Sequence, residues 1–74
     1  MTSGLKSLRR IEAVDLDGNR VAVLLGHTAG GRLAIGIVPA GRDSADIALL
    51  NADSQAKFLA AVRSAAADAA EESL

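Results

Sequence analysis

The sequence predicts an α+β protein in which a four-stranded antiparallel β-meander is followed by one C-terminal α-helix packed on one sheet face (ββββα). Two short apolar runs, 20–28 and 32–38, are rich in β-branched residues and joined by a glycine pair, which is typical of a β-hairpin. A further apolar run stands on each side of this hairpin, and the last third of the chain has helical spacing without glycine or proline. We expect one small domain over 8–74 after a flexible segment, 1–7.

The first expected strand covers 8–16 and ends at the turn Asp17-Gly18-Asn19. These turn residues tolerate the positive φ angles of a tight hairpin connection. The apolar alternation changes phase between Ala13 and Val14. This change predicts either a β-bulge or a strand that is buried on both faces.

The two central strands, 20–28 and 32–38, have two apolar faces that differ in size. Bulky aliphatic residues form one face: Val21, Val23, Leu25, Leu33, Ile35 and Ile37. Smaller residues form the other: Ala22, Leu24, Ala34, Gly36 and Val38. A sheet face in contact with water normally carries polar side chains, so we expect both faces to be covered.

A short fourth strand over 46–50 and a helix over about 52–71 complete the expected fold. Pro39 ends the third strand because it cannot donate a hydrogen bond to a sheet ladder. Asn51 or Asp53 caps the helix. The helix has an apolar stripe formed by Phe58, Leu59, Val62, Ala65, Ala66 and Ala69. We expect this stripe to cover the bulky face, with Phe58 as its main anchor.

This element order resembles that of the dimeric transcriptional coactivators that bind single-stranded DNA. The similarity lies in the order itself and in Ile47–Val62, a short strand, a capped turn and a helix with apolar anchors. The basic, aromatic sheet of those coactivators is missing, since Phe58 is the single aromatic residue.

Length and composition exclude several classes of protein. A chain of 74 residues buries a limited share of its surface, so we expect support from oligomerisation or from an unusually good aliphatic core, since small folds otherwise rely on a disulfide or a metal. The absence of cysteine excludes disulfides and thiolate metal sites. The first residues lack the apolar run of a signal peptide, and no segment is long enough to span a bilayer. We therefore expect a cytoplasmic protein without a membrane role.

No motif assembles into an enzyme or a cofactor site. The glycines of Gly26–Leu33 have phosphate-loop spacing, but Arg32 and Leu33 replace the required lysine and hydroxyl residue, and a strand follows instead of a helix. Asp15 and Asp17 begin a calcium-loop pattern that lacks its later ligands. His27 is the single histidine, and no nucleophile or carboxylate stands at a spacing that would indicate a catalytic pair with it. The sequence therefore predicts a protein that is not an enzyme and has no cofactor or metal.

Two functional hypotheses remain, and the first is a small interaction or homodimerisation module. Its interface would be the smaller face: Ala22, Leu24, Ala34, Gly36 and Val38. The alternative is a regulatory nucleic-acid binder with an arginine rim on a dimeric sheet. That rim would consist of Arg9, Arg10, Arg20, Arg32 and Arg42. Residues 1–42 carry six basic and three acidic groups, a net charge of +3, whereas the whole chain carries −1.

Overall fold

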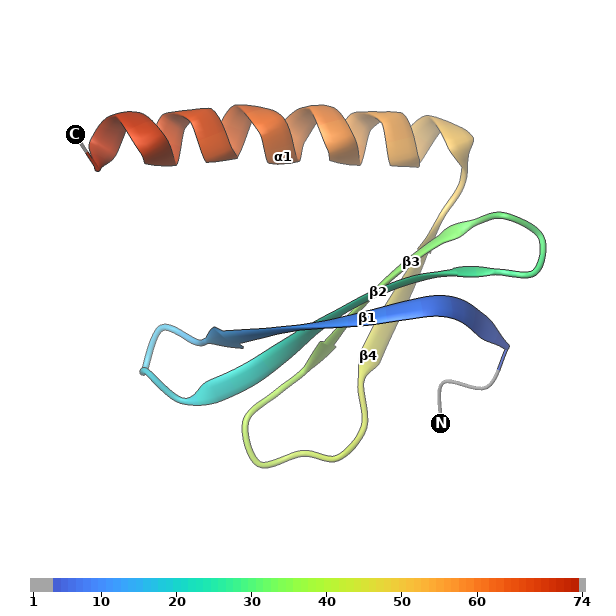
Figure 1. Ribbon diagram of the computed structural model, residues 1–74, viewed down its shortest axis with the longest axis horizontal. Coiled ribbons are helices and arrows are strands. Elements are labelled where there is room, and N and C mark those ends of the chain that lie inside the picture. The colour runs from blue at the N-terminus through green and yellow to red at the C-terminus, as the bar shows by residue number, and fades with distance from the viewer. Residues whose placement is uncertain (1–3, 74) are drawn as a thin grey trace.

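The computed structural model describes residues 4–73 and confirms the predicted fold class and element order (Figure 1). The elements are β1 (Leu5–Val14), β2 (Arg20–Thr28), β3 (Leu33–Val38), β4 (Asp46–Leu50) and α1 (Ala52–Glu72). The four strands form one antiparallel sheet in the order β1-β2-β3-β4, so each strand pairs with its neighbour in the chain.

Strand β1 begins earlier than the sequence predicts. The sequence predicts a flexible segment over 1–7. Residues 1–3 of this segment lie outside the described residues, whereas Lys6 pairs with His27 of β2 and so belongs to the sheet. The register shifts between Lys6 and Arg9, where Ser7 has a φ of 53°. This irregularity is the bulge of β1. The pairing at Ala13 and Val14 is regular, so the β-bulge predicted from the change of phase at these residues is wrong.

Side chains and glycines shape the two hairpin turns. In the β1–β2 turn, Asp15 Oδ1 accepts hydrogen bonds from the amides of Asp17 and Asn19, both at 2.9 Å, and Gly18 has a φ of 83°. In the β2–β3 turn, Thr28 Oγ1 accepts from the Arg32 amide at 3.1 Å. These bonds are local, which explains why both turns were visible in the sequence.

Directly paired residues of an antiparallel sheet share a face, so the register defines two surfaces. We call the first the bulky face: Lys6, Arg9, Ile11, Ala13, Val21, Val23, Leu25, His27, Leu33, Ile35, Ile37, Asp46, Ala48 and Leu50. We call the second the small face: Arg10, Glu12, Ala22, Leu24, Gly26, Ala34, Gly36, Val38, Ile47 and Leu49. The division predicted for β2 and β3 is therefore confirmed.

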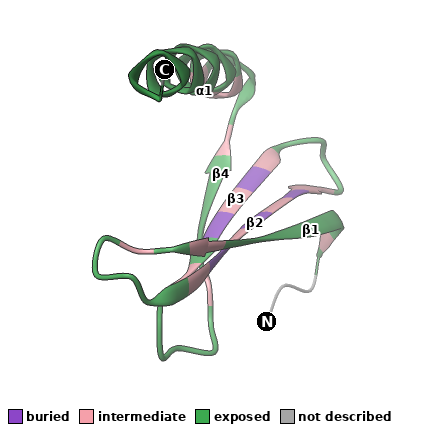
Figure 2. Ribbon diagram, turned by 60° about the vertical axis from the view of Figure 1, so that its left-hand side comes forward, coloured by how far each residue is buried: buried purple, intermediate pink, exposed green. Residues whose placement is uncertain are grey.

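The buried residues belong to β2 and β3 (Figure 2), and the strand register places them on the small face. Ala22 and Ala34 are each 1% exposed and Leu24 is 8% exposed. The two glycines of this face allow the edge strands to approach closely. A Cβ atom on Gly26 would stand 3.0 Å from the Lys6 carbonyl oxygen, and one on Gly36 would stand 3.2 Å from Ile47 Cγ1. The edge strands β1 and β4 therefore pack closely against the two glycines of the central strands.

Helix α1 does not lie on the bulky face, which corrects the predicted packing. The helix stands off from the sheet beyond the end of β4, makes its main contacts with that strand, and buries none of its residues (Figures 1 and 2). Asn51 alone connects β4 to α1, and its Oδ1 accepts a hydrogen bond from the Ser54 amide at 2.9 Å. This one-residue, capped connection places the first turn of the helix directly at the end of β4, with no loop between the two elements.

Candidate interaction surfaces

The bulky face is an aliphatic surface with no cover from its own chain. Ile11 on β1 is 50% exposed and Ile37 on β3 is 49% exposed, and the residues between them are half-buried only. The sequence indicated that the face is apolar, yet it assigned the helix to cover it. The overlooked signal was the single residue between β4 and α1.

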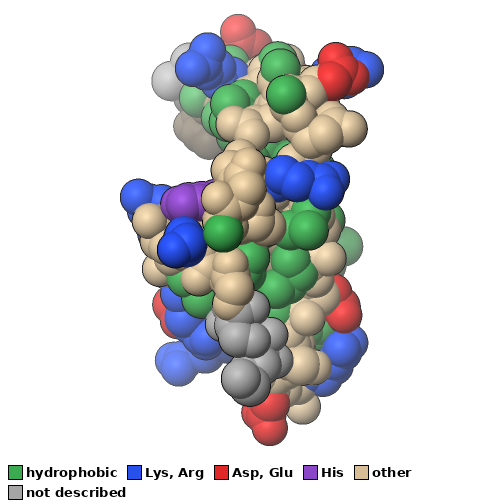
Figure 3. All heavy atoms as spheres, turned by 90° about the vertical axis from the view of Figure 1, so that its right-hand side faces the viewer, with side chains coloured by type: hydrophobic (Ala, Val, Ile, Leu, Met, Phe, Trp, Pro, Cys, Tyr) green, Lys and Arg blue, Asp and Glu red, His purple; other side chains and the backbone are tan. Residues whose placement is uncertain are grey.

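The stripe of α1 is the second exposed apolar surface. Leu59 and Val62 are each 47% exposed, and Phe58 is half-buried near the start of the helix. Beyond Ser64 the stripe continues as exposed alanine. Figure 3 shows the helix as a separate lobe, joined by a narrow waist to a sheet on which hydrophobic side chains gather. An amphipathic helix of this kind is normally stabilised by packing of its apolar face.

The residues predicted as an interface lie on the small face and are largely enclosed by the chain itself. Ala22, Leu24, Ala34 and Gly36 are buried, and Val38 is half-buried. At the β4 edge of this face, Ile47 and Leu49 are 39% and 45% exposed. The interface hypothesis for the small face stays a prediction.

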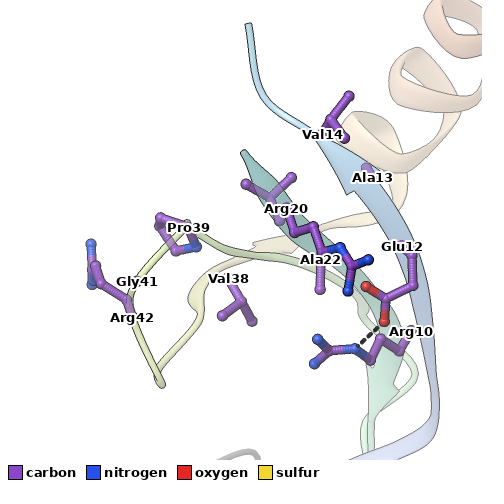
Figure 4. Close-up of a pocket in the computed structure, with 11 residues that line it drawn as sticks. Arg10, Glu12, Ala13, Val14, Arg20, Ala22, Val38, Pro39, Gly41 and Arg42 are labelled. Atoms are coloured by element: carbon purple, nitrogen blue, oxygen red, sulfur yellow. Dashed lines mark hydrogen bonds and ion pairs between the residues drawn. The ribbon is translucent and has the colours of Figure 1, made fainter. Parts of the chain in front are cut away.

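An open groove of about 810 Å³ lies at one end of the sheet, on the side of the small face (Figure 4). Its polar lining comes from Arg10 and Glu12 of β1, Arg20 of β2, and Arg42 of the β3–β4 loop. Its floor is apolar and includes Ala22 and Val38. The groove thus brings together three of the five arginines predicted to form a basic rim.

Two carboxylates partly offset the charge of these arginines. Arg10 Nε donates to Glu12 Oε1 at 2.8 Å, and Arg42 Nη2 lies 3.4 Å from Asp46 Oδ1. The hydrogen bond and charge of Arg10 lower the pKa of the Glu12 carboxyl from its ordinary value, and the charge of Arg20 lowers it further. Both ion pairs are exposed to solvent, so each contributes little to stability. The lining holds three arginines and one glutamate, so the groove has a net positive charge.

The remaining candidate residues lie elsewhere. Arg9 pairs with Leu25 and so lies at the border of the bulky face. It is on the opposite side of the sheet from Arg10, because neighbouring residues of a strand point to opposite faces. Arg32 sits in the β2–β3 turn, outside the groove. The half-buried His27 ring places Nδ1 2.9 Å from the carbonyl oxygen of Thr28, a local contact that does not organise a catalytic pair.

Within residues 4–73, no three histidine, cysteine, aspartate or glutamate side chains group in a way that would hold a metal ion. The described helix is not apolar enough over a sufficient length to cross a membrane. Comparison of the chain with family models, curated proteins and solved structures finds no match. The functional argument therefore rests on the surfaces described above.

Proposed function

We propose that this protein is a non-enzymatic self-association module whose fold is completed by a second copy of the chain. The observation that carries the proposal is the mismatch between what is buried and what is exposed. The buried apolar side chains are Ala22, Leu24 and Ala34, whereas the bulky face and the helix stripe are open to solvent. A soluble monomer rarely leaves such large contiguous apolar surfaces uncovered.

The dimensions of the chain support the proposal. A compact monomer of 7.5 kDa exposes about 4,250 Å² and one of 74 residues has a radius of gyration of about 11 Å. This chain exposes 5616 Å² and has a radius of gyration of 13.8 Å. The excess surface is about 1,400 Å² per copy, or about 2,800 Å² for two copies, which lies in the range of obligate homodimer interfaces.

Association also supplies the support that the composition lacks. Without cysteine the chain has no disulfide, and its own core is too small to offset the conformational entropy lost on folding. Burial of apolar surface between two copies stabilises at about 25 cal/mol per Å² before association costs. We therefore expect folding and dimerisation to be one event.

Light scattering on the purified chain tests this proposal. We expect a mass of twice 7.5 kDa at micromolar concentration. A mass of 7.5 kDa, together with a cooperative thermal transition, would show that one copy folds alone and would overturn the proposal.

The groove favours a second candidate function, binding of a nucleic-acid backbone. Arg10, Arg20 and Arg42 border one open surface, and guanidinium groups suit phosphate contacts that need no base recognition. The scarcity of aromatic residues argues for backbone contacts rather than base stacking.

A salt titration with single- and double-stranded oligonucleotides tests this second function. We expect affinity that falls steeply with salt, and Arg20→Gln should lower the slope of log K against log salt by about one. Arg63→Gln is the matched control, since Arg63 lies on α1 outside the groove. No binding at low salt, or equal losses in both variants, would dismiss the groove as a nucleic-acid site.

A further inference from the structure

We propose that the two copies exchange helices, so that α1 of each copy packs its stripe on the bulky face of the other. This inference rests on the proposed self-association and adds the identity of the two contacting surfaces. Both surfaces are apolar, both are exposed in the same chain, and neither covers the other. A second copy presents the missing partner of each surface at once, in a closed, two-fold arrangement.

The connection between β4 and α1 favours a partner's sheet over the chain's own. The Asn51 cap holds the backbone extended at the junction, with φ −80° and ψ 178°, and Ser54 donates to its side chain. The helix leaves the end of β4 and runs alongside its own sheet without packing on it, and its main sheet contacts are with β4 (Figures 1 and 2). Exchange of an element between copies is a common outcome when a short hinge prevents it from folding back.

The sizes of the two surfaces match. The stripe from Phe58 to Ala69 is about 17 Å long at 1.5 Å per residue. Four strands about 4.8 Å apart make a sheet about 14 Å across between the outer strand axes. The alanines of the stripe allow the helix backbone to come close to the large side chains of the sheet, so small residues on one surface meet bulky residues on the other.

Charge gives the exchanged helix a direction. The last turns of α1 carry Asp68, Glu71 and Glu72, and the last turn has no basic residue. The β1 border of the bulky face carries Arg9, and its β4 border carries Asp46. A partner's helix that ends over β1 brings its acidic end to Arg9 and keeps it from Asp46, which is the favourable arrangement.

Cross-linking between single-cysteine chains tests the exchange, because the natural chain has no cysteine to interfere. Val23→Cys marks the bulky face and Val62→Cys marks the stripe, in two chains that carry tags of different mass. Packed layers lie about 10 Å apart, so a bismaleimide with a spacer of that length can join the two thiols. Ser64→Cys is the matched control, since residue 64 lies on the opposite side of the same helix.

We expect the mixed chains with Val23→Cys and Val62→Cys to give at least tenfold more heterolinked product than those with Val23→Cys and Ser64→Cys. Equal yields, or a linked product formed mainly between two Val62→Cys chains in a particle of dimer mass, would overturn the exchange and leave self-association intact. A linkage within one chain that carries both cysteines would mean that the helix folds on its own sheet, and would also overturn it. Monomeric mass without any linkage would overturn self-association itself.

Discussion

Ile37 distinguishes a completed dimer from an isolated chain, because its side chain is 49% exposed in a single copy. Covering that half of an isoleucine removes on the order of 90 Å² of apolar surface from water. At about 25 cal/mol per Å², this burial stabilises by about 2 kcal/mol per copy and about 4 kcal/mol per dimer. Ile37→Asp loses this contribution and places a carboxylate between apolar surfaces, so the dissociation constant should rise at least about 10³-fold.

The assay is sedimentation and thermal unfolding over a dilution series, with Leu16→Asp as the control. Leu16 lies in the β1–β2 turn and is fully exposed, so the same substitution there should change the stability by less than about 0.5 kcal/mol. Ile37→Ser should act in the same direction as Ile37→Asp without placing a new charge beside Asp46, its cross-strand partner. If Ile37→Asp keeps the mass and melting temperature of the natural chain, as Leu16→Asp does, the bulky face is not an interface.

Three further predictions concern the single chain. Asn51→Ala removes the helix cap and should lower the free energy of unfolding, measured by chemical denaturation, by about 1 kcal/mol. Asn51→Asp keeps an oxygen acceptor at the cap and should retain most of the stability. Gly26→Ala should destabilise by about 1–3 kcal/mol, and by more than Gly36→Ala, because its Cβ meets a main-chain carbonyl rather than a side chain; the reverse order would contradict this packing. The depressed pKa of Glu12 makes its contribution to stability present above the unfolded-state pKa and lost as the pH falls through the folded-state pKa. An NMR titration should show this pKa rise in Arg10→Gln, and an unchanged value would refute the hydrogen bond.

The order of the elements could be predicted because its signals are local. Asp15, Gly18 and Thr28 shape the hairpin turns through bonds within a few residues, and the alternation of apolar residues assigned both faces of β2 and β3. The start of β1 was missed because Lys6 and Ser7 carry no apolar alternation and precede a bulge. The ladder to β2, a non-local interaction, makes these residues a strand.

The position of the helix was missed for a different reason. The stripe led by Phe58 predicts an apolar partner surface for α1, but periodicity does not say which surface. The answer depends on the backbone at Asn51, one residue whose conformation has no counterpart in the hydrophobic pattern.

Only part of the arginine groove could be predicted from the sequence. Arg9 and Arg10 are neighbours in one strand and must point to opposite faces, so the sequence already separates them. That Arg10, Arg20 and Arg42 share one groove follows from the strand register and from the course of the β3–β4 loop. Neither can be read from spacing along the chain.

The concentration dependence of thermal unfolding tests most directly whether a second copy completes this fold. If folding and association are one event, the unfolding enthalpy of two chains of 74 residues is about 100 kcal/mol. The melting temperature should then rise by about 5 °C for each tenfold increase in protein concentration. A cooperative transition whose midpoint stays constant from micromolar to millimolar protein would contradict the account.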